Sequence, residues 1–521
     1  MRIAAFLALL VPSFWFAWCY QDNPRFGDFS DDAFYFIGAK SIATGQEYRA
    51  LSLPNAPYQT KYPPGYPAYL SAAWGNGATF PDNMKQAVWL QWRMLPVLLL
   101  LAMFYWTKLG FEQKWVWAFA GLLALNPYMI FFSVMLMSEV PFTVFILAAL
   151  GALAMAEKRG WYWLIAAGAA AGAAFLFRTA GVSLLISAVA VFAWRKQWKQ
   201  AAVFAAAMMP FILGWTLWSK AHMSPAQDLI TLYYTNYTGF HWLNFHWNEA
   251  YLFLWKNMDG LLHGIGALIF PKSSESLLLK ILSQALGVAA ISGSWRLVKQ
   301  HNALHYGVFA VIFSGMLALW SFPPNERFVL PLAPLLIPGF CLEMRELILN
   351  IRKGFTHKDN SQRIAAKIMS AAVASLLAVC IAAQFYTVFS LMPQMMDGYR
   401  DRLARNQKAF AWMKANLPAD AKVLADQDTL FYLYTDRQSA GLVIPTIYWY
   451  REDNQTRVAS YSNGLNYAKQ HGLTHWYLTR EDFSRDIDEA DHQRIHANLA
   501  NLEGMEKLYD VDGIRLFYLR P

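Results

Sequence analysis

Charged residues are scarce in this sequence. Asp, Glu, Lys and Arg form 15% of its 521 residues and apolar residues form 56%, whereas charged residues form about 25% of an ordinary soluble domain. The scarcity is uneven, because residues 392–521 contain 34 charged residues and the first 391 residues contain only 45. This composition excludes a fully soluble enzyme and predicts a membrane-embedded module at 1–391 followed by a soluble domain at 392–521.

Cysteine and clusters of metal ligands are also lacking. Cys19, Cys341 and Cys380 lie in apolar segments without metal-ligand spacing, so we expect small buried apolar side chains rather than a disulfide framework. No cluster of His or Cys supports a metal site, and we infer none. The sequence requires no cofactor and leaves open whether a divalent metal takes part.

The chain has a net charge of +9, but its polar segments lack runs of Lys and Arg interleaved with aromatic residues. Such runs are typical of nucleic-acid binding, so we exclude a nucleic-acid partner. Basic loops on the cytoplasmic side of a membrane explain the excess of positive charge. We therefore expect membrane lipids as partners.

Eleven apolar segments approach the length of about 20 residues that a membrane-spanning helix needs. The first has bulky Trp15 and Trp18 near its end and no small-residue cleavage site, so we expect a retained helix rather than a signal peptide. The sequence therefore predicts a polytopic α-helical membrane protein with about eleven transmembrane helices. They lie near residues 3–20, 87–106, 115–132, 139–156, 161–177, 180–194, 200–218, 276–295, 304–321, 328–344 and 364–390.

Basic residues recur in every second connection between these segments. Because cytoplasmic loops are enriched in Lys and Arg, the pattern predicts a cytoplasmic N-terminus. Residues 21–86, 219–275 and 322–327 and the C-terminal domain then lie on the outer side. The basic residues are Lys108 and Lys114; Lys158 and Arg159; Arg195, Lys196 and Lys199; Arg296 and Lys299; and Arg345, Arg352, Lys353, Lys358 and Arg363.

The C-terminal soluble domain is predicted to be α/β and extracytoplasmic. Residues 396–417 and 454–470 favour helices, 423–425 and 475–479 favour strands, and 510–513 favour the turn of a closing hairpin. The domain has no Gly-rich phosphate loop and no catalytic pair at a recognisable spacing. A lid or docking platform is therefore favoured over an independent active site.

The first outer segment, residues 21–86, is too long and too patterned to be a simple connector. Asp31 and Asp32 begin a stretch that favours a short surface helix, whose N-terminal dipole stabilises a carboxylate. One Asp suffices to cap a helix, so the pair favours a functional role. Lys61 precedes a turn of two prolines that would hold its ammonium group where a lipid phosphate lies; the simpler interpretation is a proline turn with a snorkelling Lys.

Three more charges stand at the outer ends of predicted spans, namely Glu139, Arg178 and Arg327. Placing a charged side chain near the hydrocarbon costs up to roughly 2.5–3.5 kcal/mol of free energy, so each of the three needs an ion-pair partner or a functional role. A lone interfacial Arg is more often an anchor than a ligand. Together with Asp31 and Lys61, however, these groups supply both phosphate clamping and proton abstraction on one surface.

The outer motifs follow one another in a recognisable order: the acidic pair Asp31-Asp32, Ala-x5-Gly-x2-Tyr at 39–48, Lys-Tyr-Pro-Pro-Gly-Tyr at 61–66, Ser-Glu-x-Pro at 138–141, Arg178, and Arg-x3-Pro-x2-Pro at 327–334. This order resembles the GT-C superfamily of polytopic glycosyltransferases, in the branch of protein O-mannosyltransferases and lipid A aminoarabinose transferases. The resemblance covers roughly residues 1–390. It implies an inverting enzyme of a bacterial inner (plasma) membrane that moves a sugar from a polyprenyl-phosphate carrier to an acceptor on the outer face, which can be a lipid, a glycan or a protein.

The resemblance also implies roles for single residues. Asp31 would be the general base and Asp32 would orient the acceptor or support the base. Lys61, Arg327 and Arg178 would bind the phosphate of the donor, and Tyr62 and Tyr66 would bind the sugar or the acceptor. Glu139 would either bind the sugar or the acceptor or simply pair with one of the Arg residues. The sequence departs from the aminoarabinose enzymes at Tyr62, which is inserted between the Lys and the two prolines.

Two other classes of protein fit parts of the pattern. A transporter or flippase of a lipid-linked sugar also has many spans and intramembrane charges, but it tends to show two related halves and polar groups near the midplane. A structural partner of a polymer-export complex is the third possibility. The aromatic residues from Tyr233 to Trp255, with His241 and His246, favour an interfacial belt over a sugar-stacking site.

Overall fold

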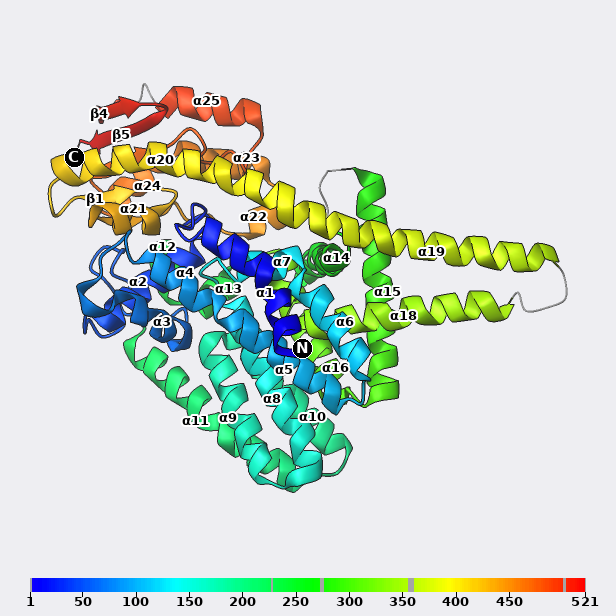
Figure 1. The fold of residues 1–521 in the computed structure, drawn as a ribbon. Helices are drawn as coiled ribbons and strands as arrows, with labels where there is room; N and C mark the ends of the chain where they lie inside the picture. Colours follow the sequence, from blue (N-terminus) through cyan, green and yellow to red (C-terminus); the bar gives the residue numbers. More distant parts are fainter. Residues whose placement is uncertain (1, 226–227, 272–275, 355–359, 500–502, 521) are drawn as a thin grey trace.

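The computed structural model describes residues 2–225, 228–271, 276–354, 360–499 and 503–520. A helical body is formed by most of the first 391 residues, and a small α/β domain covers one end of it (Figure 1). Helix α20 runs across the upper part of the view from α19 to this domain, below β4, β5 and α25, and helices α18 and α19 project from the opposite side of the body. The arrangement confirms a polytopic helical protein with a C-terminal α/β domain.

Apolar helices match the predicted spans. In the described residues, seven helices have the length and composition to cross a membrane, and three shorter apolar helices accompany them. The span expected at 115–132 is instead divided at Asn126 and Pro127, because the Asn126 side chain caps a new helix by accepting a hydrogen bond from the amide of Met129 (3.2 Å). The body helices are α1 (Arg2–Cys19), α4 (Met84–Trp92), α5 (Met94–Lys108), α6 (Gln113–Ala124), α7 (Pro127–Phe132), α8 (Glu139–Arg159), α9 (Tyr162–Phe177), η2 (Thr179–Gly181), α10 (Val182–Trp194), α11 (Trp198–His222), α15 (Leu277–His301), α16 (Leu304–Ala318), α18 (Ala333–Gly354) and α19 (Asn360–Tyr386).

Close helix packing in the body depends on glycine. A Cβ atom built on Gly293 of α15 would lie 1.8 Å from the carbonyl oxygen of Gly339 in α18. A Cβ on Gly266 would likewise lie 2.0 Å from the carbonyl oxygen of Ser283 in α15. Because lipid offers no hydrophobic force that drives helices together, such close backbone approach supplies van der Waals contact in its place.

Helices that are short, apart from the 20-residue α14, form the segments between the spans on the side of the C-terminal domain. The first segment folds as predicted into a helix that begins at Asp31, followed by a turn at residues 61–64 and a second helix at Gly65. The elements here are α2 (Asp31–Ala43), α3 (Gly65–Leu70), η1 (Ser71–Gly77), α12 (Leu229–Thr235), α13 (Tyr237–Asn244), η3 (Trp247–Glu249), α14 (Ala250–Ile269), α17 (Glu326–Val329) and η4 (Leu330–Leu332).

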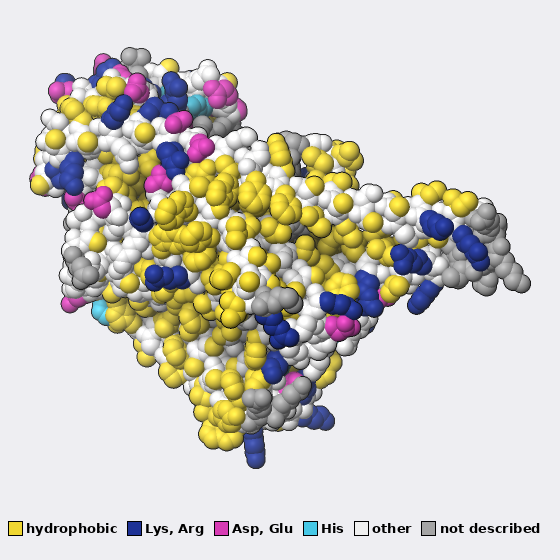
Figure 2. Space-filling model, viewed as in Figure 1, with side chains coloured by type: hydrophobic (Ala, Val, Ile, Leu, Met, Phe, Trp, Pro, Cys, Tyr) yellow, Lys and Arg dark blue, Asp and Glu magenta, His cyan; other side chains and the backbone are white. Residues whose placement is uncertain are grey.

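Basic loops gather at the other end of the body. Arg195 pairs with Glu157 (2.6 Å) and donates to Asn302 (3.0 Å), while His301 contacts the carbonyl of Leu109 (3.1 Å). These contacts bring together four of the five connections that the sequence assigns to one side; Lys358 of the fifth lies outside the described residues. Figure 2 shows Lys and Arg side chains at the lower and right ends of the molecule, away from the C-terminal domain.

The C-terminal domain has a five-stranded sheet with strand order β2-β1-β3-β5-β4. Strand β1 is parallel to both β2 and β3, whereas β5 is antiparallel to β3 and to β4. The predicted strands and closing hairpin are present, but the helix expected at 454–470 is broken at Asn463. The elements are α20 (Met392–Asn416), β1 (Lys422–Leu424), α21 (Asp428–Thr435), β2 (Gln438–Ala440), α22 (Ile447–Tyr450), α23 (Asn454–Ser462), α24 (Gly464–Gln470), β3 (His475–Leu478), α25 (Glu489–Leu499), β4 (Met505–Val511) and β5 (Ile514–Leu519).

The domain is joined to the body by helix and by polar contacts. Helix α19 continues through a π-helical turn at Thr387–Leu391 into α20, so the predicted boundary at 391 lies inside one unbroken helical segment. The amide of Ser439 in β2 donates to the carbonyl of Ser52 (2.7 Å). The domain therefore rests directly on the first outer segment.

The glycine contacts lead to a stability prediction. A Gly293→Leu protein should unfold at a lower temperature in detergent, because the new side chain must separate α15 from α18; overpacking of this kind costs about 1–3 kcal/mol. Gly315→Leu in α16 is the matched control, since no heavy atom lies within 4 Å of a Cβ built there. Equal thermal stability of the two variants, measured by intrinsic fluorescence, would contradict the importance of this contact.

Candidate active site

Arg327 lies at the centre of a buried cluster of charges. Its position follows from a short helix, α17, whose start is capped by the Asn325 side chain, which accepts a hydrogen bond from the Arg327 amide (3.1 Å). The guanidinium donates through Nε to Glu139 and through Nη2 to Asp31. The guanidinium of Arg327 thus joins a carboxylate of the first outer segment to a carboxylate of helix α8.

Glu139 is the most enclosed member of the cluster, with a side chain only 1% exposed. It begins α8, where the helix dipole favours a negative charge. Arg178, directly after α9, donates to the same oxygen, Oε1, at 2.6 Å and also contacts the hydroxyl of Ser138 at 3.2 Å. The other oxygen, Oε2, is buried and has no hydrogen-bond partner among the described residues.

Asp31 is held as a carboxylate. Burial alone would raise its pKa, but the charges of Arg327 and Lys61 and the hydrogen bonds from Tyr62 and Arg327 outweigh burial, so the pKa of Asp31 lies below its usual value. Its side chain keeps 24% exposure, more than that of Arg327 at 10%. Asp31 is therefore both ionised at neutral pH and reachable by a ligand.

Lys61 is buried among tyrosine rings. Its ammonium nitrogen lies 3.9 Å from the ring centre of Tyr233, 4.6 Å from that of Tyr237 and 5.0 Å from that of Tyr62. Across the described ranges, no carboxylate forms an ion pair with this nitrogen. Burial lowers the pKa of Lys61 to about 8, although the negative charges of Asp31 and Asp428 oppose the shift. The charged ammonium form therefore predominates at neutral pH.

The second acidic residue turns away from the cluster. The carboxylate of Asp32 accepts hydrogen bonds from the amides of Gly27 (3.0 Å) and Ala33 (2.8 Å), which ties the preceding loop to the start of α2. Burial raises its pKa to about 7 despite these two hydrogen bonds. Of the two Asp residues, the structure thus gives Asp31 the ionic contacts and Asp32 the backbone-capping contacts.

The two tyrosines of the Lys-Tyr-Pro-Pro-Gly-Tyr motif also differ. Tyr62 donates its hydroxyl to Asp31 and lies in the cluster. Tyr66 is fully buried and donates to Gln91 (2.9 Å), and its ring packs edge-on against Tyr35 (5.0 Å between centres). Tyr66 therefore lies in the layer that supports the cluster, because Tyr35 in turn contacts Ser138 (3.3 Å).

The tyrosines around Lys61 come from a segment that the sequence assigns to an interfacial belt. Tyr233 and Tyr237 face the ammonium group, and Tyr234 donates to Asp428 of the C-terminal domain (2.8 Å). The density of Tyr between 233 and 237 is the signal that could have found them. His241, by contrast, stacks on Trp320 with ring centres 5.5 Å apart, as a packing residue does.

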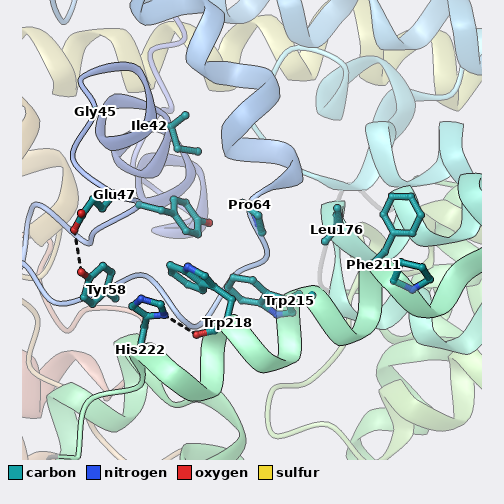
Figure 3. A pocket seen from close by; sticks show the side chains of 13 residues that line it. Ile42, Gly45, Glu47, Tyr58, Pro64, Leu176, Phe211, Trp215, Trp218 and His222 are labelled. Carbon is teal, nitrogen blue, oxygen red and sulfur yellow. Dashed lines mark hydrogen bonds between the residues drawn. The ribbon is translucent and has the colours of Figure 1, made fainter.

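An apolar groove of about 960 Å³ lies beside the cluster (Figure 3). Pro64, from the turn after Lys61, and Leu176, two residues before Arg178, form part of its wall. Glu47 accepts a hydrogen bond from Tyr58 (2.9 Å) at the polar rim. The remaining lining comes from the first outer segment and from the middle and end of α11: Ile42, Gly45, Tyr48, Pro210, Phe211, Gly214, Trp215, Trp218 and His222.

Among the residues that the structure describes, no group of three His, Cys, Asp or Glu side chains is placed to hold a metal ion. The cluster instead contains two carboxylates, Asp31 and Glu139, and three cationic groups, Arg178, Arg327 and Lys61. Its net charge is positive by one unit. Such a site can bind a single negative charge without further compensation.

The cluster leads to a prediction about Glu139. A Glu139→Gln protein should lose about 3–5 kcal/mol of stability, because Arg327 and Arg178 would keep their buried charges without this counterion. Glu157→Gln, at the other end of α8, is the matched control, since Glu157 pairs with Arg195 at the surface, where a salt bridge contributes about 0–1 kcal/mol. Thermal unfolding of both variants measures the difference, and similar losses would argue against a buried ionic cluster.

No protein-family model matches the sequence, and no curated protein matches it either. Among solved structures, the chain is similar to ArnT from Cupriavidus metallidurans bound to undecaprenyl phosphate, with 13% identity, a TM-score of 0.52 and coverage of 94% of this chain and 93% of that one. It is also similar to the oligosaccharyltransferase of Archaeoglobus fulgidus tethered with an acceptor peptide, with 13% identity, a TM-score of 0.53 and coverage of 94% and 70%. Both are GT-C glycosyltransferases. These likenesses show that the chain has the GT-C fold, as the sequence predicts.

Proposed function

We propose that the protein is an inverting glycosyltransferase that moves a sugar from a polyprenyl-phosphate carrier to an acceptor on the outer face of a bacterial inner membrane. One observation carries the proposal: a reachable carboxylate, Asp31, shares a buried cluster with an ammonium group, Lys61, that has no ion-pair partner in the described part of the chain. The first can accept a proton and the second can bind a phosphate. The fold shared with ArnT bound to undecaprenyl phosphate supports the same donor class.

The donor phosphate would bind to Lys61 and Arg327, with Arg178 behind them. A phosphodiester carries one negative charge, which matches the single positive charge in excess in the cluster. The guanidinium of Arg327 is planar and has several N–H donors, so it can give up its hydrogen bond to one carboxylate and bind two phosphate oxygens instead. Lys61, surrounded by rings rather than water, gains more from such a contact than a solvated ammonium group would.

Asp31 would act as the general base. It would remove the proton from the acceptor hydroxyl as that oxygen attacks the anomeric carbon, while the bond between this carbon and the phosphate oxygen breaks. The donor phosphate competes with Asp31 for Arg327. Donor binding would therefore weaken the main contact that lowers the pKa of Asp31 and make the carboxylate a stronger base when the substrate is in place.

The remaining predicted residues would have supporting roles. The free Oε2 of Glu139 can accept a hydrogen bond from a sugar hydroxyl, and Tyr62 can hold Asp31 in position. Asp32 would support the base by fixing the loop before α2 rather than by contacting the acceptor. Tyr66 would act through its packing against Tyr35.

The apolar groove beside Pro64 would hold part of the carrier's hydrocarbon chain. Its aromatic side chains Trp215 and Trp218 lie at the end of α11, where Trp residues mark the boundary between lipid and water. The basic loops at the far end of the body would face the cytoplasm. Glu139 and Glu157 lie at opposite ends of α8, about 27 Å apart at 1.5 Å per residue, so the cluster would face outward.

The first test removes the base. An Asp31→Asn protein keeps the shape of the side chain but should lose turnover by about 10²–10⁴ fold, the usual contribution of a positioned acid or base. Turnover is measured as sugar released from a radiolabelled polyprenyl-phosphate sugar by membranes that contain the acceptor. Asp82→Asn, on an exposed residue of the same outer segment, should keep wild-type turnover. Wild-type turnover by Asp31→Asn would overturn the assignment of the base.

The second test addresses the donor phosphate. Replacing Lys61 with Met keeps a long side chain among the tyrosines but removes the charge, so KM for the donor should rise at least about tenfold. The turnover number should change less, because the phosphate is present in both substrate and product. Lys40→Met is the control: Lys40 also contacts aromatic rings in the first segment but pairs with Asp436 (3.3 Å). If both variants used the donor alike, Lys61 would not bind the phosphate.

A further inference from the structure

A second cavity lies where the C-terminal domain meets the first outer segment. It has a volume of about 250 Å³ and is lined mainly by polar side chains. The first outer segment, the helix α20 and two loops of the sheet each provide part of its wall. Its lining comprises Gly27, Asp28, Ser30, Arg402, Asn406, Asp426, Gln427, Thr479, Glu481, Asp482, Phe483, Ser484, Arg485 and Asp486.

The cavity lies at the carboxyl ends of two neighbouring parallel strands. Asp426 comes two residues after the end of β1, and Thr479 comes directly after β3. From β1 the chain goes to β2 on one side and then crosses to β3 on the other, so the strand order reverses between β1 and β3. In open α/β sheets the crevice at such a switch point is the usual place for ligand binding.

The lining favours a ligand rich in hydroxyl groups. Carboxylates, amides, hydroxyls and two guanidiniums face one small space, so both donors and acceptors are present. Arg402 and Arg485 are already bound to Asp28, each at 3.2 Å. Carboxylates therefore outnumber free cationic groups, which disfavours phosphates and other anions.

One wall of the cavity lies next to the start of α2, where the proposed base Asp31 stands. Ser30, in its wall, is bonded to Asp31, and adjacent Cα atoms lie about 3.8 Å apart. On the opposite wall, Asp426 precedes by two residues Asp428, which accepts a hydrogen bond from Tyr234 beside Lys61 (2.8 Å). A group held against Ser30 is thus one residue along the chain from the proposed base, on the side of the soluble domain.

We propose that this cavity is an acceptor subsite that binds an uncharged sugar unit of a glycan acceptor, which places the next hydroxyl of that glycan at Asp31. The proposal rests on the proposed glycosyltransferase function and adds the class of acceptor. The soluble domain then contributes directly to substrate selection. Asp426, which is exposed in the cavity, is the residue through which the subsite is best tested.

The first experiment measures binding to the full-length protein in lipid nanodiscs. Methyl glycosides of a neutral hexose, a pentose and an N-acetylhexosamine serve as probes in saturation-transfer NMR, with the corresponding sugar phosphates as anionic counterparts. We expect transfer to at least one neutral glycoside that is lost in Asp426→Asn and in Ser484→Tyr, which fills the cavity from an exposed position. Asp512→Asn, at the exposed turn between β4 and β5, should keep the signal.

The second experiment measures kinetics with a glycan acceptor. Asp426→Asn should raise KM for the acceptor about tenfold and leave KM for the donor unchanged, because only a contact to the acceptor is lost. Absence of any glycoside signal that depends on Asp426 and Ser484 would overturn the subsite. A different result would contradict the glycosyltransferase proposal: the wild-type protein would transfer no sugar, although its cavity would still bind glycosides.

Discussion

The contacts of Arg327 hold together the parts of the protein on which the site depends. A single guanidinium reaches Asp31 in the first outer segment and Glu139 at the start of α8, and Glu139 in turn binds Arg178 after α9. These residues are separated by up to 296 positions in the chain. Four charges largely removed from water are costly in a membrane protein unless each is paired, so this network fixes α2, α8, α9 and α17 relative to one another.

The C-terminal domain completes the site rather than standing apart from it. Asp428 fixes Tyr234, and Tyr234 belongs with Tyr233 and Tyr237 to the segment that encloses Lys61. Asp28 in the first outer segment binds Arg402 of α20 and Arg485 of the sheet domain. The sequence favours a lid or platform for this domain, which stays a prediction; in the structure the domain contacts the ring system around the ammonium group through Asp428.

Local chemistry explains which features the sequence could predict. The charge deficit and the apolar segments predict the helical body, because each residue has its own free energy of transfer from water to lipid. Single charges at the edge of the hydrocarbon are costly and therefore stand out in the sequence, as they do at Asp31, Lys61, Glu139, Arg178 and Arg327. The split at Asn126 was not predicted, since an Asn-Pro pair inside an apolar run reads equally well as a tolerated kink. The tyrosines around Lys61 and the different roles of Asp31 and Asp32 depend on contacts across many residues, which no local pattern encodes.

The unpaired charge of Lys61 also affects how the product would leave the site. With Asp31 and Glu139 ionised, the cluster has one positive charge in excess, and a bound phosphodiester makes it neutral. In the proposed reaction, transfer would move one proton to Asp31 and leave a phosphate monoester with nearly two negative charges at pH 7, so the pocket would stay neutral while the products form. Only when Asp31 releases that proton to water does the pocket become negative. Deprotonation of the base would then repel the spent carrier, which couples the recovery of the enzyme to the departure of its product.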